Sequence, residues 1–159
     1  LFVAAQDERA VRRIQVQPDH VPELPLEIRI LGELELLRAM AMVRFSRFER
    51  WRDSLGWDDC EIEEDRGQND ATARLLAVHV ERAAARLTLP VKCLPRAIAL
   101  GAMLRRRGIA HHIVIAARSS KKREEGDPLH AWAERSGKTL IGDQPGPWIE
   151  MFRSGRSTG

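Results

Sequence analysis

The sequence predicts an α+β fold in which N-terminal helices, among them a central helix that carries a cysteine, pack on a small antiparallel sheet. Up to Gly108, apolar residues recur at spacings of three and four, which is typical of amphipathic helices. After Gly108 the apolar period changes to two and β-branched residues become frequent, which indicates strands. The chain has 159 residues, of which 43% are hydrophobic, so it can bury the core of one domain.

Composition excludes several classes of partner. The net charge of +3 is mild and is not gathered into the basic face of a nucleic-acid-binding protein. No apolar run approaches the roughly 18 residues that a membrane span needs. Two cysteines, Cys60 and Cys93, make no disulfide framework, which favours the reducing cytoplasm. No Cys/His set has zinc-ligand spacing, so we expect neither a metal nor another cofactor.

Residues 1–25 are predicted to be an arm or linker, and residues 26–159 the folded domain. Pro18, Pro22 and Pro25 lie close together in the arm and favour an extended chain. The sequence begins at Leu1 rather than Met and no secretory signal pattern follows, so we expect a fragment of a longer protein.

Three helices are predicted in the first part of the domain. The first carries an apolar stripe that we expect to pack in the core, formed by Leu34, Leu37, Ala41, Phe45 and Phe48, with Trp51 at its end. The second is capped by Asn69 or Asp70 and buries Leu76, Val80, Ala83 and Leu87. The third follows Pro90, is apolar on nearly every side and ends at three arginines, 105–107, and Gly108. It is therefore predicted to be the central helix.

Three strands are predicted after Gly108, over residues 110–118, 129–135 and 138–143. Ser136 and Gly137 form a tight turn between the last two. The polar loop 119–127 is either a flap over a substrate or a plain solvated connection. The turn-rich tail is expected to tuck Trp148 or Phe152 against the core.

Cys93 is predicted to lie on the first turn of the third helix, where free N–H groups and the helix dipole favour a thiolate. The alternative is a buried cysteine that behaves as a small hydrophobe. If Ser136 and Gly137 are the two turn residues, Arg135 pairs with Lys138, and counting outward places His130 opposite Asp143. Directly opposed residues have Cβ atoms about 4.5–5.5 Å apart.

Cys93, His130 and Asp143 would thus supply a nucleophile, its base and an acid that orients the base. His111 and His112 compete with His130 for the role of base, although neither has an acid so clearly opposite. Trp132 shares a face with His130, where it either shields the site or packs in the core.

Two segments, "KCLPRAIALGAMLRRRGIAHHIVIAAR" and "LHAWAERSGKTLIGD", closely resemble the lasso peptide biosynthesis B proteins. These are leader peptidases with a transglutaminase-like, papain-related core. The resemblance covers roughly residues 91–144, and Cys93, His130 and Asp143 occupy the family's nucleophile, base and acid positions.

The resemblance implies that the protein removes the leader from a lasso precursor peptide in the cytoplasm. The implied partners are that precursor, a leader-recognition domain protein and an ATP-dependent lasso cyclase, which closes the ring on the freed amine. Under this resemblance, residues 1–25 could be the remnant of such a recognition domain or its linker. Two other functions stay open: an acyl transferase or amidase that acts on another peptide through the same thiol, and a non-catalytic scaffold with an inert cysteine.

Overall fold

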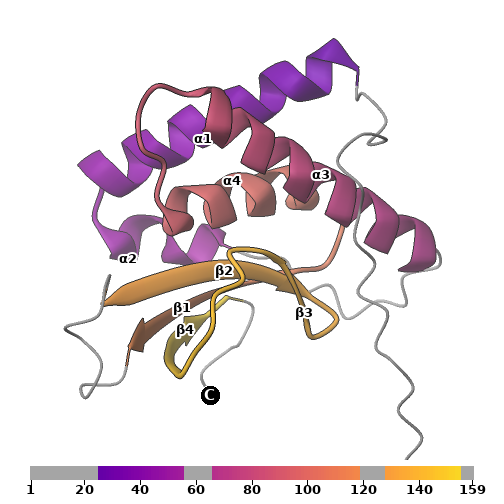
Figure 1. Cartoon of the computed structure of the whole chain (residues 1–159). Helices are drawn as coiled ribbons and strands as arrows, with labels where there is room; N and C mark the ends of the chain where they lie inside the picture. Colours follow the sequence, from indigo (N-terminus) through magenta and orange to yellow (C-terminus); the bar gives the residue numbers. More distant parts are fainter. Residues whose placement is uncertain (1–24, 56–65, 119–127, 155–159) are drawn as a thin grey trace, which may run out of the picture.

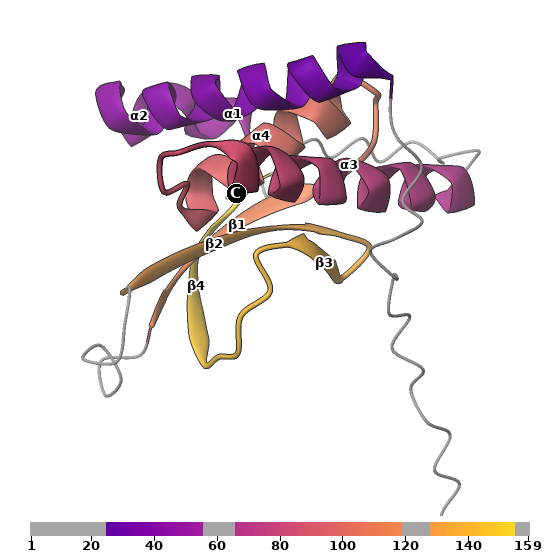
Figure 2. The ribbon, with the colours of Figure 1, turned by 45° about the horizontal axis from the view of Figure 1, so that its top comes forward.

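The structure is a computed structural model that describes residues 25–55, 66–118 and 128–154. Its long helices lie on one face of a four-stranded antiparallel sheet: α3 (Arg66–Arg86) and α4 (Cys93–Arg105) contact the sheet, and α1 (Leu26–Phe45) packs on these two helices (Figures 1 and 2). The predicted α+β fold is therefore confirmed. The predictions for residues 1–24, Cys60 and the loop 119–127 lie outside the described residues.

Helix α1 (Leu26–Phe45) buries a face other than the predicted one. Its buried residues are Gly32, Glu35, Leu36 and Ala39. The predicted stripe faces solvent, because Leu34 is 58%, Leu37 45% and Phe45 83% exposed. The prediction that this stripe packs in the core is wrong. The helix carries apolar residues on more than one side, and the face with the small residues lies against α4, where Gly32 approaches Met103.

Only the end of the stripe packs as expected. A short helix α2 (Phe48–Trp51) and a 3₁₀ turn η2 (Arg52–Ser54) follow α1. The Phe48 ring lies edge to face with Trp51, at a centroid distance of 4.8 Å, and with Phe152, at 5.3 Å. Trp51 is buried and Phe152 packs against the core, as predicted for both residues.

Helix α3 (Arg66–Arg86) buries the predicted residues Leu76, Val80 and Ala83. It begins at Arg66, so the prediction that Asn69 or Asp70 caps it is wrong. Asp70 instead lies inside the helix and accepts a hydrogen bond of 2.6 Å from Arg135. That arginine side chain is only 3% exposed, so this ion pair fixes α3 to the sheet beneath it.

Helix α4 (Cys93–Arg105) is the central helix, as predicted. Most of its residues are buried, and it contacts α1, α3 and the sheet. Each arginine at its end has a partner within the chain: Arg105 donates to the carbonyl of Ser54, Arg106 pairs with Glu35, and Arg107 donates to the carbonyl of Met103. These contacts favour a structural role for the three arginines.

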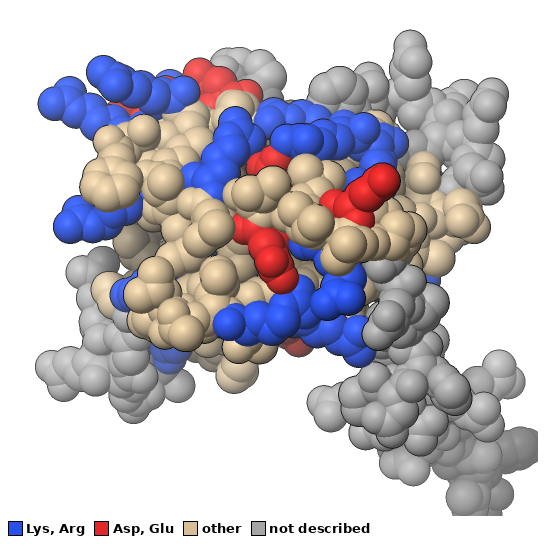
Figure 3. All heavy atoms as spheres, turned by 90° about the horizontal axis from the view of Figure 1, so that it is seen from above, with Lys and Arg blue, Asp and Glu red and all other residues tan. Residues whose placement is uncertain are grey.

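Charged side chains of both signs are interspersed on the helical face (Figure 3). One cross-helix pair joins Arg86 of α3 to Glu33 of α1 at 2.8 Å. Such exposed pairs contribute little to stability, roughly 0–1 kcal/mol. The hydrophobic core between the helices and the sheet therefore holds the layers together. None of the described helices is long and apolar enough to span a bilayer.

The sheet contains β1 (His112–Arg118), β2 (Leu129–Arg135), β3 (Lys138–Ile141) and β4 (Trp148–Arg153), in the order β3-β2-β1-β4. The first three strands and the turn were predicted. Ser136 and Gly137 have φ angles of 49° and 73°, which define the two-residue hairpin turn. The fourth strand, at the edge beside β1, was not predicted.

A bulge shifts the register of the β2–β3 hairpin. Arg135 pairs with Lys138 and Glu134 with Thr139, as predicted, but Ala133 then pairs with Ile141. The extra residue is Leu140, which is partly buried against the core, while Ile141 is 4% exposed. In a regular strand these neighbours would point to opposite faces. The bulge accommodates two consecutive apolar residues at the core.

Candidate active site

One cleft of about 570 Å³ is lined by all three predicted site residues, which come from three separate segments, but no hydrogen bond joins any two of them in the described part of the chain. Its described lining residues are Glu81, Val91, Lys92, Cys93, Arg96, Arg118, His130, Gly142, Asp143 and Gln144. The cleft lies where the N-terminal end of α4 meets the sheet. The thiol of Cys93, the imidazole of His130 and several charged side chains therefore line the same cavity.

Cys93 is the first residue of α4, as the sequence predicted. Lys92 before it has an extended backbone, with φ −74° and ψ 170°, and the first turn contains no acidic residue. The cysteine is half-buried and has no disulfide partner among the described residues. A sulfur in this position lies beside free backbone N–H groups at the positive end of the helix dipole. It is thus accessible from the cleft, unlike an inert core thiol.

His130 lies on β2 and is 5% exposed. Its Nε2 is 2.5 Å from the carbonyl oxygen of Gly142. Because a carbonyl can only accept, Nε2 carries the proton in this contact. The neutral ring then has Nδ1 as its proton acceptor, and that nitrogen can serve as a base toward a thiol.

The structure does not place Asp143 directly opposite His130. The bulge has shifted the register, and β3 ends at Ile141, so that part of the prediction is wrong. Asp143 is exposed and lines the cleft, but among the described residues no hydrogen bond joins it to His130 or Cys93. Its role as the orienting acid stays a prediction.

Gly142 is the site residue that the sequence analysis missed. Its φ of +85° lies in the left-handed region, and a Cβ built there would be 2.7 Å from the carbonyl oxygen of Ala131. Both features require glycine at this position. A glycine at the end of a strand and directly before the candidate acid was the available signal.

We expect Gly142→Ala to lower the kcat of any reaction that uses His130 as a base by about tenfold or more, because the strained backbone must move the carbonyl that holds the His130 ring. Steady-state kinetics of Asp143→Ala on the same substrate then show which of the two groups, the carboxylate or the carbonyl, orients the ring. If Asp143→Ala retains nearly full activity, the Gly142 carbonyl orients the ring. A Gly142→Ala enzyme as active as wild type would contradict this assignment.

Two tryptophans flank the imidazole of His130. The Trp148 ring is stacked on it at a centroid distance of 5.0 Å, and the Trp132 ring at 6.0 Å. The guanidinium carbon of Arg118 lies 4.7 Å from the centroid of the Trp148 ring. Trp132 therefore contacts the site, and β4 adds Trp148, which the sequence analysis had expected only to pack against the core. These rings restrict the motion of the imidazole and exclude water from one side of it.

The two competing histidines lie elsewhere. His111 is 1% exposed, and its Nδ1 is 2.8 Å from the carbonyl oxygen of Ile109. The Nδ1 of His112 is 2.8 Å from the carbonyl oxygen of Ser154. Neither residue lines the cleft that contains Cys93. Of the three candidate bases, His130 is the one that shares a cavity with the thiol.

His111 makes stability depend on pH, because burial lowers its pKa to about 4 from the ordinary value of 6.5. The folded state binds this proton more weakly than the unfolded chain, so the free energy of unfolding falls as the pH decreases from about 6.5 to about 4. We expect a loss of about 3 kcal/mol over that range. Urea unfolding at several pH values measures it. His111→Gln should flatten this part of the profile and His112→Gln should not; an unchanged profile in His111→Gln would contradict the prediction.

The described residues contain no group of three or more His, Cys, Asp or Glu side chains placed to hold a metal ion. What the cleft offers is a thiol at a helix N-terminus, an oriented imidazole and nearby backbone N–H groups. This set can carry out acyl transfer through a thioester.

The comparison with protein families identifies the class to which this fold and cleft belong. A profile of the transglutaminase-like superfamily matches residues 36–151, which is well over half of the chain. The chain therefore belongs to the transglutaminase-like superfamily, whose members are often cysteine proteases or acyltransferases. Searches of curated proteins and of solved structures each gave no significant match.

Proposed function

We propose that this protein is a cysteine peptidase that removes the leader from a lasso precursor peptide. The observation that carries the proposal is the cleft shared by Cys93 and His130, in which the Gly142 carbonyl fixes the imidazole. The superfamily membership supports thiol chemistry, and the resemblance of residues 91–144 to lasso peptide biosynthesis B proteins supports the choice of substrate.

The proposed reaction begins when His130 takes the proton of Cys93 and the sulfur attacks the scissile carbonyl carbon. Backbone N–H groups at the start of α4 stabilise the negative charge that develops on the carbonyl oxygen. The C–N bond then breaks, and the imidazolium of His130 gives its proton to the leaving amine. Water hydrolyses the thioester, which releases the leader as an acid and regenerates the thiol.

Charged side chains beside the cleft brace the segment before Cys93. Arg96 donates to the carbonyl of Val91 at 3.1 Å and pairs with Glu81 at 2.8 Å, which holds the segment before Cys93 in place. The thiol is therefore presented from a braced segment. In the proposed pathway, a separate leader-recognition domain protein delivers the precursor, and an ATP-dependent lasso cyclase uses the freed amine.

The proposal is tested by incubating the protein with a lasso precursor peptide, with and without a leader-binding partner protein. Mass spectrometry then identifies the products. We expect a leader fragment with the mass of leader plus water and a core peptide with a free amine. A leader fragment joined to an added amine would show acyl transfer instead. If no product forms and Cys93 resists iodoacetamide at pH 6, the protein is a scaffold and the proposal fails.

A further inference from the structure

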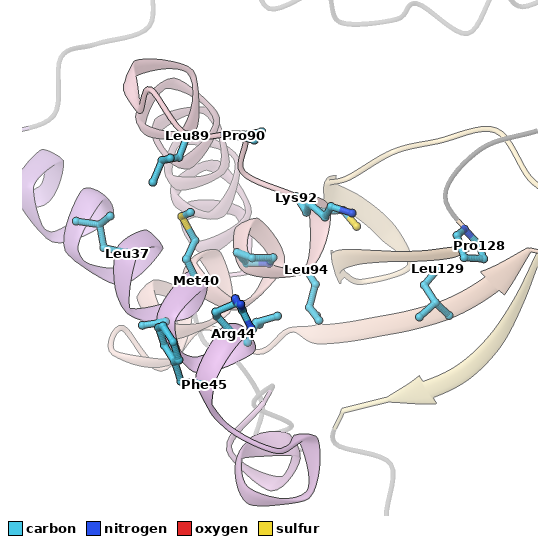
Figure 4. A pocket seen from close by; sticks show the side chains of 14 residues that line it. Leu37, Met40, Arg44, Phe45, Leu89, Pro90, Lys92, Leu94, Pro128 and Leu129 are labelled. Atoms are coloured by element: carbon cyan, nitrogen blue, oxygen red, sulfur yellow. The ribbon is translucent and has the colours of Figure 1, made fainter.

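A second hollow, a groove of about 700 Å³, opens on the other side of Cys93 and is almost entirely apolar. Its walls come from the C-terminal half of α1, the segment 89–95 and the start of β2 (Figure 4). Leu37, Met40 and Phe45 project from α1, and Leu94 and Leu129 lie across from them (Figure 4). We call this hollow the apolar groove.

The apolar groove is lined by large apolar side chains that are exposed to solvent, although residues of this kind are usually buried in a folded protein. Phe45 is 83%, Leu89 59%, Leu129 54% and Leu37 45% exposed, and these residues come from three separate parts of the chain. Their convergence on one hollow is therefore not a by-product of the periodicity of one helix. Large apolar patches of this kind mark binding surfaces, and both the volume and the lining of the groove fit a ligand pocket.

The apolar groove is continuous with the cleft described above, because Lys92 and Cys93 line both hollows. The two hollows differ in chemistry. The cleft contains the charged residues Glu81, Arg96, Arg118 and Asp143, whereas the groove has Arg44 and Lys92 as its charged described residues. Arg44 lies 5.8 Å from the centroid of the Phe45 ring, so its charge covers an apolar wall.

We infer that the apolar groove binds apolar side chains of the peptide substrate on one side of the scissile bond, while the polar cleft receives the other side. This inference rests on the proposed function. A peptide whose carbonyl carbon meets the sulfur must continue away from Cys93 in two directions. One direction leads into the polar cleft and the other into the apolar groove. The preferred substrate therefore has bulky apolar residues on one flank of the cleaved bond.

Two leucines of α1 provide a matched pair for the test. Leu37 lines the apolar groove, and Leu34, one turn earlier, does not. They are exposed to similar extents, 45% and 58%. Replacement of either by aspartate thus makes the same chemical change in the same helix. Aspartate has a lower helix propensity than leucine, so both variants should lose some stability. Thermal melting checks that the two variants lose a similar amount.

The test uses two alkylating probes that differ only in an apolar group: chloroacetamide and N-(4-phenylbutyl)chloroacetamide. Each forms a bond between the Cys93 sulfur and the methylene carbon and releases chloride, and mass spectrometry follows the rate. In the wild-type protein we expect the phenylbutyl probe to react about tenfold faster or more, because the groove buries its apolar group. Leu37→Asp should remove most of this preference, and Leu34→Asp should retain it.

The outcomes separate this inference from the proposed function. If both probes react with wild-type protein at similar rates, the groove has another occupant, such as a partner protein or a second copy of the chain, and the inference fails while the reactive thiol remains. Loss of the preference in both variants alike would also overturn it. If neither probe alkylates Cys93, the proposed function fails and the inference fails with it.

Discussion

We expect Cys93→Ala to abolish the proposed peptide cleavage and to leave the fold intact. This result is expected because the variant removes the atom that attacks the carbonyl, and neither His130 nor the backbone N–H groups can replace it. We expect the rate to fall at least about a thousandfold, as for other nucleophile deletions. Alanine suits the first turn of a helix, and Cys93 is half-buried, so thermal melting should change little.

The matched control for Cys93→Ala is Cys60→Ser, which changes the other cysteine of the chain. It should retain cleavage and also rapid alkylation by iodoacetamide at pH 6, whereas Cys93→Ala should lose both. Product masses from precursor incubations give the rate in each variant. Cleavage by Cys93→Ala at a wild-type rate would reject the thiol mechanism.

His130→Ala is expected to lower the rate nearly as much as Cys93→Ala. Without the imidazole, no group takes the thiol proton or returns a proton to the leaving amine. The loss should be about a hundredfold to ten thousandfold in kcat. The side chain is buried and the Trp148 ring is stacked on it, so its removal leaves a space beside Trp148 in which free imidazole can bind.

Chemical rescue distinguishes a catalytic from a structural role for His130. Added imidazole should restore part of the activity of His130→Ala in a concentration-dependent way and should leave Cys93→Ala inactive. His130→Gln, which can still donate to the Gly142 carbonyl, should fold like the wild type and remain slow. Nearly full activity in His130→Gln would show that the ring is only a packing element.

The sequence predicted the parts of the fold in which local and tertiary preferences agree. Helix α4 is apolar on nearly every side, so only the centre of the molecule can accommodate it. Ser136 and Gly137 adopt left-handed φ angles that specify a two-residue hairpin turn, and the flanking strands followed from their alternation. Because these elements were predicted correctly, Cys93 and His130 were expected near each other, and both line one cleft in the structure.

The errors arose where two arrangements satisfy the same pattern. Helix α1 has more than one apolar side, and small Gly32 and Ala39, not the bulky stripe, decided which side packs on α4. Counting residue pairs outward from the turn could not reveal the bulge at Leu140, because the bulge depends on the core beneath the hairpin. The Gly142 carbonyl was missed because the sequence marks only the glycine before the candidate acid, and the bulge decides which backbone group meets His130.

The two hollows on either side of Cys93 take most of their walls from different elements. The apolar groove is built chiefly by α1 and the segment 89–95, whereas His130 belongs to β2 and Gly142 directly follows β3. Residues of α1 can therefore vary without moving the imidazole or its carbonyl partner. Under the proposed function, substrate choice and bond breaking therefore fall to different elements, so that changes in α1, by evolution or by engineering, would alter which peptides bind while the chemistry stays constant.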